Sequence, residues 1–466
     1  MTSTYDKDIK NNESAAYIGY EINFDQDYSL VKPLIGKKCY NIKKDFLRKH
    51  KHNKIDYFVV LPKNSYPQNF FGGSTNYLDY ELPKLPNHTF GKFVLSYTIT
   101  NNSLTDSAWL NIGPLQIERI SLLINSNALG SDITDQMILF HNLQRNCEID
   151  GLSNDGANFA QEFNLHIANG NFSSVSNLSS WGTCTTGITL PATYHMNYKI
   201  ELPISLSESE IVSNSIKDVV VIRVYFKKTI SIPKQGTNAG NPVLDTQITL
   251  SNCQLYLRLN ELSRECLKRY YGQPKINHIF NKTIVNKYII NQLSTGQEQS
   301  IVLNSFSSIT SGCWIFLTDP DSFTLNNTWN SNAYGKPLPY FYQWAINNVF
   351  ITNSVGINIL NGINYDQDYN RYVLQEHFGV LSAALEKLCY NGYNNGFIYY
   401  IPFCGNGEDS VFKNEYNGAI AFDGNAKLHF SGGQNASSSP LVVNIIFNVP
   451  SNLELVNGSL LEIYPN

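Results

Sequence analysis

Two stretches near the end of the chain decide the fold class: GAIAFDGNAKLHF at residues 418–430 and VVNIIF at residues 442–447. We interpret the first as a strand, a turn and a second strand that carries an Asn-Ala-x-Leu motif. The second is a strand of β-branched and aromatic residues, which favour sheets. Gly and Asn, which favour turns, lie between such runs here and throughout the chain. This end of the chain is therefore expected to be antiparallel β structure.

The same pattern continues upstream, where short apolar or alternating runs stop at Pro, Asn or Gly. Residues 198–206 alternate with Ile200, Leu202 and Ile204 on one side, whereas residues 374–390 have the apolar spacing of a helix. Such spacing predicts an all-β sandwich or barrel with few helices. The predicted strands are 57–61, 93–100, 117–124, 198–206, 219–226, 255–259, 301–303, 314–317, 349–352, 397–401, 419–422, 427–430, 441–447 and 460–464.

A faint internal repeat indicates two copies of one unit. ISLLINS at residues 120–126 resembles VFITNS at residues 349–354, and each is followed by a glycine turn and an amphipathic segment. The charged segment 263–276 contains Gly272 and Pro274 and marks the expected boundary. We predict four parts: an N-terminal arm at 1–56, a first sandwich at 57–262, a linker at 263–276 and a second sandwich at 277–466.

The composition fits a globular β protein. Of 466 residues, 42% are hydrophobic, 13% are aromatic and only 15% are charged, against about 25% charged in an ordinary domain. Much of the polar surface must come from 57 Asn residues. The aromatic content argues against a disordered chain, and no apolar run approaches the roughly 18 residues of a membrane helix. The charged first ten residues do not resemble a signal peptide, so we expect synthesis in a cytosol.

Positive charge is concentrated in one window. The net charge is −4, but residues 37–54 carry eight Lys or Arg against Asp45 alone, which makes this window +7 and the remainder −11. One interpretation is a contact with phosphate, in nucleic acid or lipid head groups. The other is a solvated arm without a partner. The candidate contact residues are Lys43, Lys44, Arg48, Lys49 and Lys51.

No catalytic, cofactor-binding or metal site is predicted. The eight Cys are scattered without a CxxC pair, as expected for small core residues in a reducing compartment. Phosphate-loop, zinc-protease and nucleophile-elbow motifs do not occur. The acidic pairs in 25–27, 319–321 and 366–368 lack calcium-loop spacing and are expected to be turn residues, and Glu376-His377 is expected on a helix surface. The paired carboxylates of a glycosidase stay an alternative, because they are set by distance in space.

Taken in order, the two stretches quoted first and NVPSNLELVNGSL at residues 448–460 resemble the end of the second jelly roll in the double-jelly-roll major capsid proteins of DNA viruses. That lineage includes large eukaryotic DNA viruses, virophages and polinton-like elements. Residues 117–143 resemble the family's segment of strand, turn and aromatic helix, with Asn125 to Ala128 where Gly-Gly is common. Residues 200–206 and 219–226 resemble its Leu-Pro strand pair. The resemblance covers roughly residues 90–466.

The resemblance implies an all-β chain of two tandem eight-stranded antiparallel jelly rolls with short helices in loops. It implies a structural protein and not an enzyme: a major capsid protein whose homotrimers are pseudo-hexameric capsomers of an icosahedral virion shell. Assembly would take place in the cytoplasm or nucleus of the host cell. The implied partners are the chain itself, neighbouring capsomers, penton and minor capsid proteins, and an inner membrane or the genome through the N-terminal arm. Loops 146–195 and 319–340 would form outer towers.

Two alternatives of other classes stay open at this point. A carbohydrate-binding tandem β-sandwich could use the many Tyr and Trp residues as sugar platforms. A glycosidase on a β scaffold would need two carboxylates that face one cleft.

Overall fold

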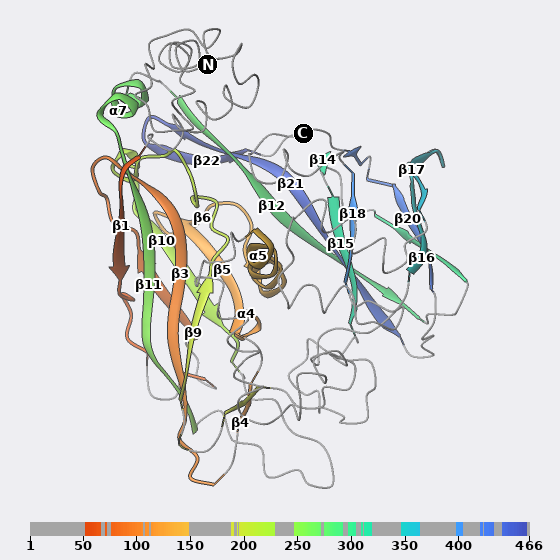
Figure 1. Cartoon of the computed structure of the whole chain (residues 1–466), viewed down its shortest axis with the longest axis horizontal. Coiled ribbons are helices and arrows are strands. Elements are labelled where there is room, and N and C mark those ends of the chain that lie inside the picture. The colour runs from red at the N-terminus through yellow and green to blue at the C-terminus, as the bar shows by residue number, and fades with distance from the viewer. Residues whose placement is uncertain are drawn as a thin grey trace, which may run out of the picture.

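The computed structural model shows a chain built mostly from strands, with three short α-helices and a 3-10 turn at Ser213–Ser215 in the parts that it describes (Figure 1). The helices are α4 (Gly113–Gln116), α5 (Asp135–Glu148) and α7 (Arg264–Tyr271). In the described part of the chain, no helix is long and apolar enough to cross a membrane. The structure describes residues 52–66, 70–71, 76–105, 108–110, 113–148, 188–190, 193, 195–228, 247–271, 275–291, 297–303, 309–310, 312–318, 346–363, 398–403, 420–422, 424–432 and 440–463.

The first half of the chain forms a sandwich of two antiparallel sheets. One sheet has the strand order β1-β11-β3-β9, and the other has the order β2-β10-β5-β6, with β7 also paired to β5. The strands are β1 (His52–Val60), β2 (Tyr77–Glu81), β3 (His88–Asn101), β5 (Ile117–Ile124), β6 (Asn127–Ala128), β7 (Ile133–Thr134), β9 (His195–Glu201), β10 (Val220–Phe226) and β11 (Ile248–Leu262).

The second half forms another sandwich of the same kind. Its sheets have the orders β12-β21-β15-β18, extended by β22 on β21, and β13-β20-β16-β17. The strands are β12 (Lys275–Ile290), β13 (Glu298–Val302), β15 (Gly312–Thr318), β16 (Ile346–Thr352), β17 (Asn358–Ile363), β18 (Ile398–Pro402), β20 (Lys427–Gly432), β21 (Leu441–Val456) and β22 (Ser459–Ile463). Two small extra sheets pair β4 (Ala108–Leu110) with β8 (Ile188–Leu190), and β14 (Ile309–Thr310) with β19 (Ile420–Ala421).

Both sandwiches have the same topology. With the extra pairs set aside, β22 left out and β6 and β7 counted together, each sandwich has eight strands along the chain. In each, one sheet contains the first, eighth, third and sixth strands, and the other contains the second, seventh, fourth and fifth. Two four-stranded antiparallel sheets connected in this way are a jelly roll. The predicted fold class is therefore confirmed.

The internal repeat seen in the sequence corresponds to equivalent strands. Residues 120–126 contain the end of β5, and residues 349–354 contain the end of β16; each is the fourth strand of its jelly roll. Both strands end in a turn: Asn125 and Ser126 have positive φ in the first, and Gly356 has positive φ in the second. The two segments resemble each other because each must end a buried strand and reverse the chain at the same place.

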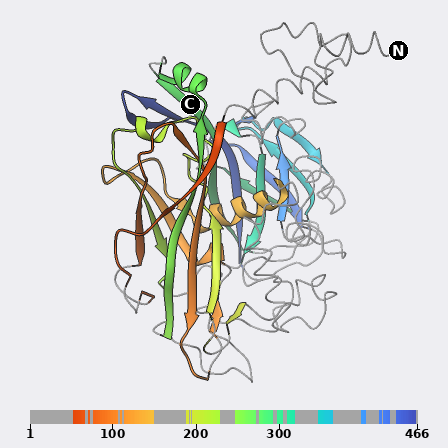
Figure 2. The same ribbon diagram turned by 60° about the vertical axis from the view of Figure 1, so that its left-hand side comes forward.

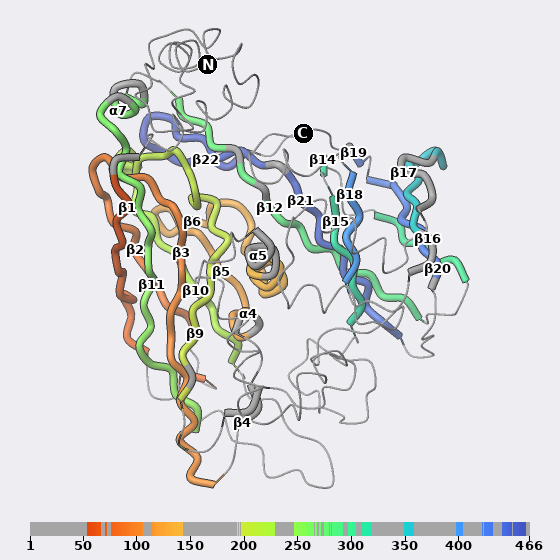
Figure 3. The backbone as a smooth tube through the Cα atoms, viewed as in Figure 1, coloured from red at the N-terminus to blue at the C-terminus, as the bar shows by residue number. Residues whose placement is uncertain are grey.

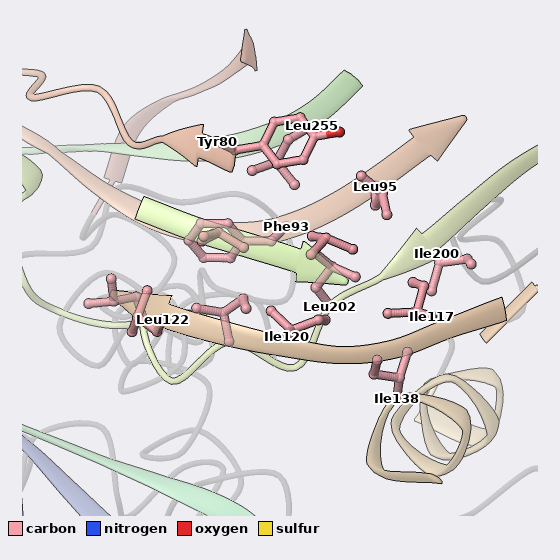
Figure 4. Packing of buried hydrophobic residues seen from close by; sticks show 14 of the residues in the cluster. Tyr80, Phe93, Leu95, Ile117, Ile120, Leu122, Ile138, Ile200, Leu202 and Leu255 are labelled. Atoms are coloured by element: carbon pink, nitrogen blue, oxygen red, sulfur yellow. The ribbon is translucent and has the colours of Figure 1, made fainter. Parts of the chain in front are cut away.

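Alternating side chains build the core of each sandwich. In β10 every second residue is buried, which is the two-residue period of a strand with one face in the core. Figure 4 shows Phe93 and Leu95 of β3 facing Ile117 and Ile120 of β5 across the first core. Ile138 of α5 lies on the outer side of β5, so helix α5 covers that strand (Figure 4).

Strands β12 and β21 extend beyond the second sandwich and reach the first (Figure 3). They pair along 16 residues, from Lys275 with Val456 to Ile290 with Leu441. Near one end of this pair, Ile276, Leu453 and Leu455 are buried in the same hydrophobic cluster as the core of the first sandwich. This cluster therefore joins the two halves of the molecule.

The structure differs from the sequence predictions in several elements. The strand expected at 198–206 ends at Glu201, because Pro203 has no N–H to donate to a neighbour; Leu202 and Ile204 are nevertheless buried. Among the strands longer than three residues, β2, β12 and β17 were not predicted. The helix expected at 374–390 and the loop 319–340 lie outside the described residues, as does nearly all of loop 146–195.

The ends of the strands and helices can be compared with the predicted boundaries between the four parts of the chain. Strand β1 begins at His52, so the last residues of the expected arm are strand. Strand β11 ends at Leu262, helix α7 follows, and β12 begins at Lys275. The division into four parts stays a proposal.

Candidate functional site

The residues that the sequence singled out for function are mostly not described. Lys43, Lys44, Arg48, Lys49 and Lys51 lie outside the described residues. So do Glu376-His377 and the acidic pairs in 25–27, 319–321 and 366–368. Of the basic window, the structure describes the side chain of Lys54, whose Nζ lies 2.5 Å from Oδ1 of Asp56 on the same strand. The geometry that bears on function therefore comes from other residues.

Helix α5 lies between the two sandwiches in both ribbon views (Figures 1 and 2). It begins at Asp135, whose carboxylate accepts a hydrogen bond from the backbone N–H of Gln136 at 2.8 Å. An acidic residue at this end is favourable, because the free N–H groups give it a partial positive charge. Met137, Ile138, Leu139 and Phe140 follow and are all buried. A helix with several buried sides is suited to fill the space between two sheets.

Aromatic rings connect α5 to the second sandwich. The ring of Phe140 stacks on Phe316 with 5.0 Å between centroids, and lies 5.7 Å from the ring of Trp314. Both partners belong to β15, and all three side chains are fully buried. Large buried aromatics contribute more to packing than other side chains do. This contact is therefore a major part of the junction.

A buried chain of hydrogen bonds fixes the position of α5. Nε2 of Gln136 donates to Oδ1 of Asn444 on β21 at 3.0 Å, and Nδ2 of Asn444 donates to Oγ1 of Thr318 on β15 at 2.9 Å. All three residues are fully buried. Because an unpaired buried polar group costs roughly 1–3 kcal/mol, a shift of the helix along the sheet would be penalised. The two sandwiches are thereby held in one register.

The last hairpin of the chain also contacts the first sandwich. Glu462 of β22 forms a largely buried ion pair with Lys282 of β12, with Nζ and Oε1 2.8 Å apart. Gly130 lies directly against this carboxylate and has φ +70°, so a side chain there would clash. Nearby, the backbone N–H of Lys217 donates to the carbonyl of Gly458 at 2.9 Å. The C-terminal hairpin is therefore built into the junction.

One cavity of about 220 Å³ lies at this junction and is lined by residues of both sandwiches. Several of its charged residues are held by partners. Asp132 accepts hydrogen bonds from Arg119 and from Ser121, and Glu462 is paired with Lys282. The cavity is smaller than the roughly 300–1,000 Å³ of a typical ligand pocket. These carboxylates therefore serve structural ion pairs, and the arrangement is not that of a glycosidase cleft.

The described buried thiols are not suited to nucleophilic chemistry. Cys253 and Cys313 are buried and free of disulfides. Burial raises the pKa of both thiols well above the usual value, since the thiolate is poorly solvated there. Neither is a thiolate near neutral pH, so both behave as small core residues, as the sequence predicted.

The edge of the first sandwich exposes an apolar strand. Strand β1 pairs with β11 on one side, and no described strand lies on its other side. Its side chains include Ile55, Phe58 and Val59, which are 40–47% exposed, and Tyr57, which is 73% exposed. Leu61, just after the strand, is also exposed. A sheet edge that is both unpaired and apolar is prone to pair with another chain. This edge is the candidate interaction surface, and it was not recognised in the sequence.

Similarity to known proteins is found among solved structures. No family model and no curated protein matches the chain. Among solved structures, VP54 of PBCV-1, fitted into a reconstruction of the virophage Sputnik, has a TM-score of 0.59 at 10% identity; the match covers 89% of this chain and 98% of that one. The Faustovirus major capsid protein has a TM-score of 0.53 at 10% identity and 96% and 98% coverage.

A third structure, that of the Sputnik virophage, matches with a TM-score of 0.52 at 13% identity and 89% coverage of both chains. At such low identities the likeness establishes the fold. It extends over nearly the whole length of both chains, so it includes both jelly rolls. The chain therefore has the double-jelly-roll fold of the Faustovirus major capsid protein and of the PBCV-1 and Sputnik structures.

Proposed function

We propose that this chain is the major capsid protein of an icosahedral DNA virus and that it acts in the virion as a structural protein. The observation that carries the proposal is that two jelly rolls of identical strand order are locked together by α5, and that this whole arrangement matches viral capsid structures. A building block of a shell needs a fixed shape more than it needs a cleft. The buried junction supplies such a shape.

In the proposed capsomer, three chains form a closed ring. Three chains contain six similar sandwiches, so a trimer has a pseudo-hexagonal outline that tiles a surface. A ring of this kind repeats one pair of complementary patches three times. Obligate interfaces commonly bury more than about 2,000 Å² and are poor in charge at their centre. A chain with only 15% charged residues suits such contacts.

The sugar-binding alternative has no comparable support. Sugar platforms require exposed aromatic rings, but many described aromatic residues fill the cores. The fully buried aromatic side chains include Trp314, Tyr80, Tyr97, Tyr198, Tyr399 and Tyr400. Core packing therefore accounts for many of the aromatic residues that the structure describes.

The apolar edge formed by β1 and Leu61 is the surface that we assign to contact between copies of the chain. Its exposed side chains and its unpaired backbone groups can both be covered by a neighbouring chain. Replacing Tyr57 by lysine would place a charge in that contact. We expect Tyr57→Lys to shift the protein from trimer to monomer. Val355→Lys is the matched control, because Val355 is 80% exposed in a turn of the second sandwich.

Further partners follow from the proposed role. They are neighbouring capsomers, penton and minor capsid proteins, and phosphate groups of the genome or of an inner membrane, which the basic arm would contact. Changing Lys43, Lys44, Arg48, Lys49 and Lys51 together to serine should impair shell assembly and leave trimers intact. Normal virion yield from that variant would contradict the role of the arm.

The central test is the mass of the purified protein in solution. Size-exclusion chromatography with light scattering should give three times 52.6 kDa, and electron micrographs should show particles with a hexagonal outline. A persistent monomer, or a monomer that binds a glycan array, would overturn the proposal. A trimer that Tyr57→Lys does not affect would leave the capsomer standing and refute only the assignment of the β1 edge.

A further inference from the structure

Three potential metal ligands meet on adjacent strands of the first sandwich. Asp56 lies on β1, Glu261 on β11 and His88 on β3, which are neighbours in the sheet. A nitrogen of His88 and one carboxylate oxygen from each acid lie within 4.8 Å of one another. Within the described residues, no other group of three His, Cys, Asp or Glu side chains is arranged in this way. The cluster sits where β3 begins and β11 ends.

The orientation of His88 identifies the atom that faces the cluster. Its Nδ1 lies 2.6 Å from the carbonyl oxygen of Pro86, and its Nε2 lies 3.3 Å from Oδ2 of Asp56. A carbonyl cannot donate, so Nδ1 carries the proton of that hydrogen bond. A metal-bound histidine is commonly held in this way by its second nitrogen. In the neutral ring, Nε2 then presents a lone pair to the lone pairs of a carboxylate, an arrangement that requires a cation or a further proton between them.

One separation between ligand atoms matches the geometry of a small divalent cation. Zn²⁺ binds nitrogen and carboxylate oxygen at about 2.0–2.2 Å in a tetrahedron, so two ligand atoms are about 3.3–3.5 Å apart. The separation of 3.3 Å between Nε2 of His88 and Oδ2 of Asp56 agrees with that value. Glu261 is partly exposed, and one of its carboxylate oxygens lies within 4.8 Å of the other two ligand atoms. Calcium is a poorer fit, because it prefers six to eight oxygen ligands.

The charges of the cluster also favour a cation. Two carboxylates face the imidazole of His88 and the ammonium of Lys54, which pairs with the other oxygen of Asp56. The carboxylates therefore outnumber the ammonium by one. Lys54 is largely exposed, with 64% of its side chain accessible, and can swing into water when a metal ion binds.

We propose that Nε2 of His88 and the carboxylates of Asp56 and Glu261 bind one Zn²⁺-class divalent cation, with water completing the coordination. The ion would link β1 to β3 across β11. It would thereby fasten the edge strand that bears the exposed apolar side chains. This proposal is independent of the proposed function, since it concerns a site within one chain.

The test is zinc binding by the full-length, metal-free protein, measured by isothermal titration calorimetry. We expect one specific site per chain and at least tenfold weaker binding in Glu261→Gln and in Asp56→Asn, which keep the side-chain shape. Co²⁺ should give the visible spectrum of a low-coordinate site. Glu298→Gln is the matched control: His429 pairs with Glu298 at 2.8 Å on neighbouring strands but belongs to no group of three ligands, so this change should leave the affinity unaltered.

Three results would overturn the proposal. The first is no saturable zinc binding at millimolar metal. The second is binding that neither Glu261→Gln nor Asp56→Asn weakens, which would place the zinc on other histidines. The third is equal weakening by Glu298→Gln. Circular dichroism checks that each variant is folded; if one acidic variant unfolds, the other decides the outcome.

Discussion

Replacing Phe140 by alanine should separate the two sandwiches. The Phe140 ring is fully buried, and its centroid lies 5.0 Å from that of Phe316 and 5.7 Å from that of Trp314. Truncating a buried phenylalanine costs about 3–5 kcal/mol. We therefore expect the free energy of unfolding to fall by about 4 kcal/mol. Because both ring partners belong to the second sandwich, much of this loss would fall on the junction between the sandwiches. The single unfolding transition should then become two.

The assay is urea unfolding followed by circular dichroism and fluorescence at one protein concentration. Phe140→Leu is the matched variant, because it keeps the apolar bulk and loses only the two ring pairs. At about 0.5–1.5 kcal/mol for each pair, it should lower the free energy of unfolding by about 1–3 kcal/mol and keep a single transition. Phe93→Ala removes a buried ring inside the first core. It should lower stability without splitting the transition. A loss below about 1 kcal/mol for Phe140→Ala, or equal splitting in Phe93→Ala, would refute the reasoning.

Three further outcomes are expected. Asp79→Asn should lower the free energy of unfolding in urea by about 1–2 kcal/mol, because it breaks a partly exposed ion pair in which Arg223 donates two hydrogen bonds (2.7 and 2.8 Å) to Asp79. An unchanged free energy of unfolding would show that this ion pair does not stabilise the protein. Gly130→Ala should lower the melting temperature, since φ is +70° and the new Cβ would meet Glu462. Cys253 and Cys313 should resist iodoacetamide at pH 8 and react in urea, as burial raises the pKa of each; rapid labelling of folded protein would contradict this.

Strands with a strong apolar pattern could be predicted from the sequence. The prediction at 117–124 coincides with β5, and that at 219–226 differs from β10 by one residue. Strand β12 was missed because KINHIFNKTIVNKYII mixes Lys and Asn with its apolar residues. It forms because β21 pairs with it along its whole length. The alternation in residues 198–206 identified buried side chains correctly, but not the end of the strand.

The functional surfaces were much harder to predict. The basic residues chosen from the sequence lie outside the described part of the chain, and their role stays a prediction. The exposed apolar edge at β1 was predicted only as a strand, because exposure depends on which neighbours a strand has. The resemblance to capsid proteins anticipated the double jelly roll, and the topology confirms it.

By itself, the sequence determined that this chain consists of strands and turns in two similar units. That information is local, because a strand with one buried face must alternate and a turn needs Gly or Asn. Only the tertiary structure decided which strands are neighbours. Gln136 and Asn444 are 308 residues apart and yet share a hydrogen bond, and Asp56, His88 and Glu261 meet from three strands. Such contacts depend on the path of the whole chain, which no local pattern records.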